Sequence, residues 1–134
     1  MNILVIDGQG GGIGKLLVSG MKSEYPDFFV TAVGANSIAT SAMLKAGADA
    51  AATGENAVCV GCRKADVIAG PVGIVIADAL LGEITPKMAA AIGQSDAKRV
   101  LVPVNHCDNI VVGVGDIPMA KLVQSAVKEI GKGS

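Results

Sequence analysis

The sequence predicts one α/β domain, built as a doubly wound, mostly parallel sheet of about five to six strands with helices on both faces. Short aliphatic runs alternate along the chain with segments in which apolar residues recur every three or four positions. The first of these runs is continuously apolar, as in a strand buried on both faces of a parallel sheet. No linker or repeat divides the 134 residues. We therefore expect a single domain over residues 1–131 and a frayed tail at 132–134.

The first two strands and helices have clear patterns. Asn2–Ile6 (NILVI) predicts a strand, and apolar residues at positions 13, 16, 17 and 21 predict the helix after it. Phe28–Val33 (FFVTAV) predicts the second strand. Asn36 or Ser37 can then cap a helix that stops at Gly47.

The middle of the chain leaves one alternative open. Asp49–Thr53 predicts a short third strand and Asp66–Gly70 (DVIAG) a fourth. Between them, Glu55–Ala65 fits a helix, but its AVCV run also fits a strand, because periodicity cannot separate the two over so few residues. Further on, Thr85-Pro86 predicts the start of another helix, with a capping hydroxyl and a proline in the first turn.

The last third continues the alternation. Arg99–Val104 (RVLVPV) predicts a strand with Pro103 near its end, and Asn109–Val114 is a candidate for one more strand. A final helix is expected to open after Pro118. Its apolar stripe consists of Met119, Leu122, Val123, Ala126, Val127 and Ile130.

A glycine-rich loop joins the first strand to the first helix. The stretch DGQGGGIGKLL places four glycines within Gly8–Gly12 and then turns into a helical pattern. Glycine lets a phosphate approach the backbone without meeting a Cβ, and the start of a helix offers free N–H groups. This context predicts a Rossmann-like nucleotide-binding loop. Its predicted binding residues are Gly8, Gln9, Gly10, Gly11, Gly12, Ile13, Gly14 and Lys15.

The spacing within the loop favours a dinucleotide. The pattern Gly8-x-x-x-Gly12-x-Gly14 resembles the short-chain dehydrogenase loop, although that family's Tyr-x-x-x-Lys pair is missing. In a comparison with the P-loop of nucleoside triphosphatases, Leu16 stands where a magnesium-binding hydroxyl belongs. We therefore expect NAD or NADP, with a mononucleotide as the smaller alternative.

Two further turns are expected to complete the site. The second βα turn carries Asn36 and Ser37 in place of the acidic residue that commonly binds the adenosine ribose, so these two are predicted to meet the ribose. Gly70 and Pro71 follow the strand across the switch point and are predicted to face the middle of the cofactor. A crossover loop that only packs on the sheet explains the same two residues equally well.

Catalytic and metal-binding candidates are few. His106 follows a predicted strand and would lie at the carboxyl edge of the sheet, with a side chain suited to proton transfer near neutral pH. Glu55 and Glu83 stand near probable helix starts, where capping is the commoner role and acid catalysis the rarer one. Cys59-x-x-Cys62 and Cys107 supply thiols for a metal or redox site, or else serve as small buried hydrophobes.

Composition excludes several classes of partner. A net charge of −1 and only three aromatic residues argue against nucleic-acid binding. The longest uncharged apolar run, residues 67–77, is too short to span a membrane.

Three cysteines and no visible secretory signal lead us to expect a cytoplasmic location. The hydrophobic content of 51% leads us to expect a homo-oligomer.

Four stretches, VIDGQGGGIGK, SIATSAMLKAGA, ATGENAV and ADVIAGPVGIV, resemble a family of small bacterial proteins classified as a domain of unknown function. The resemblance spans nearly the whole chain and implies a Rossmann-like fold, but it implies no activity. The first functional hypothesis is therefore a small NAD(P)-type nucleotide-binding protein that acts as a sensor or accessory module. The alternatives are an enzyme that uses His106 or Glu55 beside a bound nucleotide, and a carrier of a metal or redox cofactor.

Overall fold

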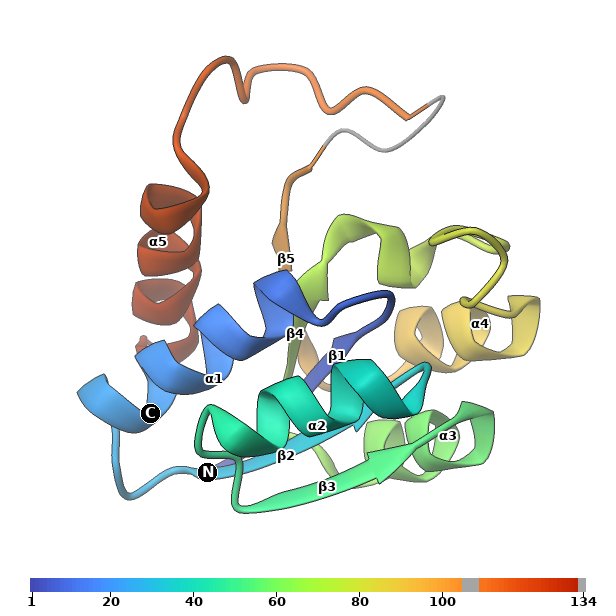
Figure 1. Ribbon diagram of the computed structural model, residues 1–134, viewed down its shortest axis with the longest axis horizontal. Coiled ribbons are helices and arrows are strands. Elements are labelled where there is room, and N and C mark those ends of the chain that lie inside the picture. Colours follow the sequence, from blue (N-terminus) through green and yellow to red (C-terminus); the bar gives the residue numbers. More distant parts are fainter. Residues whose placement is uncertain (105–108, 133–134) are drawn as a thin grey trace.

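The computed structural model describes residues 1–104 and 109–132, in which a five-stranded parallel sheet lies between two layers of helices (Figure 1). The strands are β1 (Asn2–Asp7), β2 (Phe29–Gly34), β3 (Ala50–Thr53), β4 (Val67–Pro71) and β5 (Lys98–Val102). The helices are α1 (Gly12–Glu24), α2 (Ser37–Lys45), α3 (Glu55–Lys64), α4 (Pro86–Gln94) and α5 (Met119–Gly131), with a short 3₁₀ helix, η1 (Val72–Val75). The predicted α/β class and its parallel sheet are confirmed.

The strand order, β3-β2-β1-β4-β5, is that of a doubly wound Rossmann-like sheet. All four pairings are parallel, and Val5 of β1 lies opposite Ala32 of β2 and Ala69 of β4. The chain adds strands outward on one side of β1 and then crosses to the other side. The order therefore reverses between β1 and β4, and ligands of open α/β sheets bind at the carboxyl end of such a switch point.

Two hydrophobic cores hold the helices against the sheet. Alternate residues of β1 face opposite ways: Ile3 and Val5 belong to the core shared with α1, α2 and α5. Leu4 and Ile6 belong to the core shared with α3, α4 and η1. This arrangement explains why the first strand has no polar face.

The ambiguous AVCV run is helical. Val58, Cys59 and Cys62 form the buried face of α3, and an added Cβ at Gly61 would lie 3.0 Å from Leu4 Cδ2 of β1. Helix α4 begins as predicted, because the Thr85 hydroxyl accepts the Met88 N–H at 3.1 Å. The apolar pattern of the run fits a helix and a strand equally well. Its place on one face of the sheet, packed against β1, identifies it as a helix.

The strand expected at Asn109–Val114 is wrong. Within the described part of the chain, this segment contains a single bridge residue at Asn109, followed by turns. Gly113 and Gly115 have φ values of 93° and 59°, in the left-handed region that interrupts an extended strand. Figure 1 shows the segment running away from the body before it returns to α5.

Two further expectations concern the C-terminal tail and a membrane-spanning segment. Lys132, placed in the frayed tail, still pairs with Glu129 at 2.8 Å, and residues 133–134 lie outside the described chain. Among the described residues, no helix is long and apolar enough to cross a membrane.

Candidate functional site

The glycine loop lies at the switch point between β1 and β4. It connects the end of β1 to the start of α1 and borders a hollow of about 200 Å³. The hollow is lined by residues 7–13 together with Pro71 and Leu80. This volume is below the roughly 300–1,000 Å³ of pockets that hold drug-sized ligands. A group the size of a phosphate fits the hollow better than a whole cofactor does.

Asp7, the last residue of β1, organises the loop from below. Its side chain is buried, and its two carboxylate oxygens accept the N–H groups of Gly8 and Gly14, each at 2.7 Å. Burial raises the pKa of Asp7, while hydrogen bonds from Gly14, Gly8 and Ile13 act in the opposite direction. Asp7 therefore satisfies amides at the start of α1 that a ligand would otherwise meet.

Glu83 reaches the same loop from the other side. Its Oε1 accepts the Gln9 N–H at 2.5 Å, and its Oε2 accepts the Asn36 side-chain amide at 2.6 Å. A Cβ added at Gly8 would lie 2.8 Å from Glu83 Oε1 and 2.9 Å from Leu80 Cδ1. Gly8 is thus a glycine because the protein's own side chains cover it.

The predictions from sequence missed the roles of Asp7 and Glu83. The place of Asp7 could have been predicted, since an acidic residue at the end of a buried strand lies at the carboxyl edge of the sheet, next to the loop. Glu83 was expected near a helix start, but α4 begins at Pro86 and is capped by Thr85. Glu83 lies 74 residues from Gln9 in sequence, and no local pattern relates the two.

The other loop glycines divide into two kinds. Gly11 has φ +70°, and an added Cβ would lie 3.0 Å from Ala39; one at Gly14 would lie 2.6 Å from Met43 Sδ. Both glycines are required by the turn and by helix packing. Gly10 and Gly12 are exposed, have no left-handed φ, and an added Cβ there would meet nothing within 4 Å. Their amides have no hydrogen-bond partner in residues 1–104 and 109–132.

Asn36 is held at the site, whereas Ser37 and Lys15 face elsewhere. The Asn36 side chain caps α2 by accepting the Ala39 N–H at 2.9 Å, and it also donates to the Gln9 carbonyl oxygen at 2.9 Å. Ser37 and Lys15 are exposed and line a separate groove between α1 and α2, of about 680 Å³. Of these three side chains, as far as the structure describes the chain, only that of Asn36 hydrogen-bonds to the glycine loop.

Gly70 and Pro71 end β4 beside the loop. An added Cβ at Gly70 would collide with the carbonyl oxygen of Ile6 on the neighbouring strand, so this glycine serves the close approach of β4 to β1. Pro71 lines the hollow. Pro71 thus lies beside the glycine loop, and its role in cofactor binding stays a prediction, whereas Gly70 has a structural reason of its own.

The cysteine pair lies in the hydrophobic core. Cys59 and Cys62 are free and buried on α3, and burial raises the pKa of Cys62 to about 11, with Cys59 adding to the shift. A thiol with so high a pKa is a poor nucleophile and a poor metal ligand. Within the described residues, no three His, Cys, Asp or Glu side chains lie close enough to hold a metal ion. Cys107 lies outside those residues.

Glu55 contributes to the packing of α3 against α4. Its Oε2 accepts the hydroxyl of Thr85, the residue that caps α4, at 2.5 Å. Glu55 is also the acidic residue in the first turn of α3, where a negative charge is favourable. His106, the other catalytic candidate, lies outside the described residues, so its role stays a prediction.

A parallel sheet in this strand order, with a glycine loop at its switch point, defines a Rossmann-like α/β protein. The chain belongs to the family described as a domain of unknown function (DUF3842), whose model matches residues 2–133. No curated protein matches the chain. A similar solved structure is a dodecameric FMN-dependent UbiX-like decarboxylase from Escherichia coli O157:H7. It is 18% identical, the match covers 96% of this chain and 76% of that one, and the TM-score is 0.47.

The prediction of NAD or NADP is contradicted by this comparison: the similar solved structure is described as FMN-dependent. The contacts at the second βα turn give a physical reason. The Asn36 amide, expected to meet the adenosine ribose, already donates to Glu83 and to the Gln9 carbonyl. In the conformation that the structure shows, Glu83 and Leu80 also cover Gly8, where a dinucleotide would pass.

Proposed function

We propose that this protein binds a nucleotide of mononucleotide size through its phosphate group, which the glycine loop receives, and that it works as a sensor or accessory module. The observation that carries the proposal is the pair Gly10 and Gly12. Neither position needs glycine for its backbone angles or for space inside the fold. Glycine in a loop or first helical turn costs conformational entropy, so its use at both positions favours close approach of an outside group.

Hydrogen bonding supports the same proposal. The amides of Gly10 and Gly12 are exposed and lack partners in the described part of the chain, so they are the loop's free donors. They lie at the start of α1, where the helix dipole favours negative charge. The hollow beside them has the size for one phosphate, and the rest of a mononucleotide would extend along the carboxyl edge of the sheet.

The test is a titration of the purified protein with AMP, FMN and inorganic phosphate, followed by calorimetry and by the NMR shifts of the loop amides. We expect saturable binding of at least one nucleotide and shifts at Gly10 and Gly12. Replacing Gly12 with Val is expected to weaken binding by at least about tenfold, because branched atoms would block the approach of the phosphate. Thermal unfolding of the variant shows whether the fold is preserved.

The chain offers a matched control. Gly93 on α4 is also an exposed glycine at which an added Cβ meets nothing within 4 Å, but it lies outside the site. Gly93→Val is expected to leave nucleotide binding unchanged. Equal binding by the Gly12 variant and by the wild type, or no binding of any of the three compounds by the wild type, would overturn the proposal.

A further inference from the structure

We infer that Glu83 is an internal competitor of the ligand: its carboxylate occupies the anion-binding side of the glycine loop, and a bound phosphate must displace that carboxylate. This inference rests on the function proposed above. The loop concerned comprises residues 78–84, between η1 and α4, and is called here the Glu83 loop.

The contacts of Glu83 are those expected of a bound anion. Each of its two carboxylate oxygens accepts one N–H group at the site, from the Gln9 backbone at 2.5 Å and from the Asn36 side chain at 2.6 Å. Leu80 of the same loop is buried, and it packs near Gly8 and Gly73. The Glu83 loop therefore closes the hollow with an apolar side chain and a negative charge together.

Two carboxylates already contact the glycine loop, and their negative charge disfavours the binding of another anion. Asp7 and Glu83 both accept N–H groups from the glycine loop, and the charge of Glu83 contributes to raising the pKa of Asp7. Among the described residues, no Lys or Arg side chain hydrogen-bonds to this loop to offset them. A phosphate that entered with Glu83 in place would be repelled, so the exchange of one anion for the other is the favourable route.

Displacement of Glu83 would complete a phosphate cradle. It releases the Gln9 N–H and one N–H of the Asn36 amide, which add to the free amides of Gly10 and Gly12. Four donors from one loop and one neighbouring turn suit the oxygens of a single phosphate group. The closed form shown by the structure is thus the ligand-free partner of an open, phosphate-binding form.

The Glu83 loop is anchored in the core by Leu80 and Ile84, which are buried, whereas Glu83 itself is half-buried. Its two ends are joined by the Asp78 N–H to the Ile84 carbonyl at 2.7 Å and by the Ile84 N–H to the Ala79 carbonyl at 3.1 Å. Asp78, Leu80 and Leu81 have φ values of 66°, 57° and 58°, which side chains other than glycine rarely adopt. The side chain of Glu83 can therefore leave the glycine loop by rotating about its own bonds, while Leu80 and Ile84 stay in the core.

The first experiment measures the affinity for inorganic phosphate and for AMP in the wild type and in two variants. Glu83→Ala removes the competing carboxylate, and we expect it to bind both probes at least about tenfold more tightly. Glu83→Gln keeps an acceptor but loses the charge, and its affinity is expected to lie between the other two. Glu24→Gln removes one negative charge at the far end of α1 and is expected to bind as the wild type does.

The outcomes separate this inference from the proposed function. If the wild type binds AMP but Glu83→Ala binds it equally or less tightly, the inference fails, the proposed function stands, and Glu83 is a ligand contact. If neither the wild type nor either Glu83 variant binds any probe, both fail.

A second measurement does not depend on a ligand. Native-state hydrogen exchange is expected to be at least about 100-fold faster at the amide of Gln9 than at Val5 in the central strand, because the Glu83 carboxylate that accepts the Gln9 N–H leaves the glycine loop locally. In Glu83→Ala the Gln9 amide is expected to exchange faster still, while Val5 stays unchanged. Exchange of Gln9 at the rate of Val5 would show that Glu83 leaves the glycine loop only on global unfolding, and would overturn the inference.

Discussion

At the scale of single residues, the glycine loop shows two uses of glycine within five positions. Gly11 and Gly14 make room for neighbouring helix α2, as their short distances to Ala39 and Met43 show. Gly10 and Gly12 face open space and keep free amides. The first kind serves the fold, and the second kind is available to a ligand. The two kinds therefore respond differently to an added methyl group.

We expect Gly14→Ala to lower the free energy of unfolding by about 1–3 kcal/mol, because its Cβ would overlap Met43 and Asp7. Gly12→Ala is expected to leave the free energy of unfolding unchanged or to raise it by about 0.4–1 kcal/mol, through lower entropy of the unfolded chain. Urea unfolding monitored by circular dichroism measures both. A loss of more than about 1 kcal/mol in Gly12→Ala would show that position 12 needs glycine for the fold, and would remove the argument that carries the proposed function.

The predictions from sequence included the glycine loop and Asn36, but they gave no binding role to Asp7 or Glu83, whose carboxylates contact the loop. The four glycines are local in sequence and sit between a strand and a helix, so their pattern is readable without a structure. Glu83 and Asn36 meet them only because the switch point brings the turns after β2 and β4 to one edge. Glu83 is moreover carried by an irregular loop with left-handed residues, for which periodicity gives no signal.

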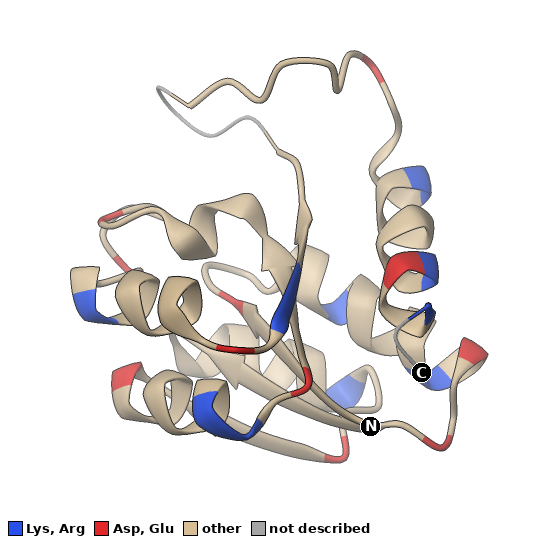
Figure 2. Ribbon diagram, turned by 180° about the vertical axis from the view of Figure 1, so that it is seen from behind, with Lys and Arg blue, Asp and Glu red and all other residues tan. Residues whose placement is uncertain are grey.

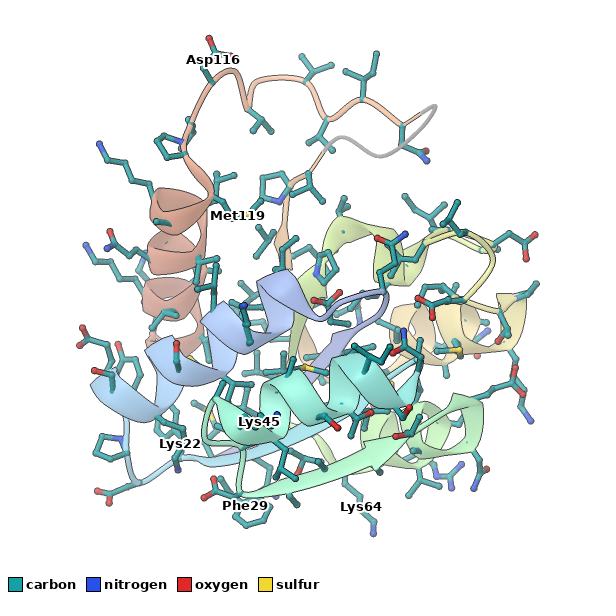
Figure 3. All side chains as sticks on the ribbon, viewed as in Figure 1. Lys22, Phe29, Lys45, Lys64, Asp116 and Met119 are labelled. Carbon is teal, nitrogen blue, oxygen red and sulfur yellow. The ribbon has the colours of Figure 1, made fainter. Side chains whose placement is uncertain are left out.

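At the scale of elements, one ion pair joins the end of α1 to Asp49, the residue before β3. Lys22 on the last turn of α1 donates to Asp49 at 2.9 Å and to the carbonyl oxygens of Pro26 and Phe28 (Figure 3). Asp49, just before β3, also accepts the Val30 N–H at 2.8 Å. The hydrogen bond from Val30 and the bond from Lys22 lower the pKa of Asp49. One carboxylate thus connects three elements.

We expect Asp49→Asn to lower the free energy of unfolding at pH 7 by about 1 kcal/mol, since the side chain is partly exposed and screened. The pKa of Asp49 is lower in the folded protein than in the unfolded chain. Its stabilising contribution is therefore present above the unfolded value of 3.8 and is lost as the pH falls through the folded value. Unfolding curves of wild type and variant from pH 7 to about pH 2 should converge at the acid end. A difference that stays constant with pH would mean that the charge of Asp49 contributes nothing.

Elements were predictable where burial follows a simple period and not where it depends on tertiary position. The continuous apolar run of β1 predicted a strand, because both faces of that strand are buried. The apolar stripe of α5 predicted a helix, because one face of that helix is buried. The valine-rich run at 109–114 satisfied the same composition rule as a strand. Gly113 within this run and Gly115 just after it have left-handed φ values, which interrupt an extended strand, and the described sheet does not include the run.

At the scale of the whole molecule, the sheet is covered on both faces, but one segment is left outside. Ile110 and Val112 expose 78% and 92% of their surface, and Ile117 exposes 47%. Asp116 is the one charged residue among residues 109–118. Figure 2 shows this segment mostly uncharged, and Figure 3 shows Asp116 far from the sheet. Clustered aliphatic side chains of this kind are typical of surfaces that another molecule covers. The homo-oligomer expected from composition remains a prediction, and this segment is where it can be tested.

We expect thermolysin, which cuts before large aliphatic residues, to cleave the dilute native protein within residues 109–118, because this backbone belongs to no helix or sheet. Helix α5 should stay bound after cleavage, since Val123, Val127 and Ile130 are buried in the core shared with α1. If copies associate through the segment, the cleavage rate per molecule should fall as the protein concentration rises, in step with the mass measured by sedimentation. Mass that rises with concentration while cleavage stays constant would place the interface elsewhere. Constant mass at every concentration would show that the exposed valines and isoleucines do not hold copies together, and the prediction of a homo-oligomer would then be wrong.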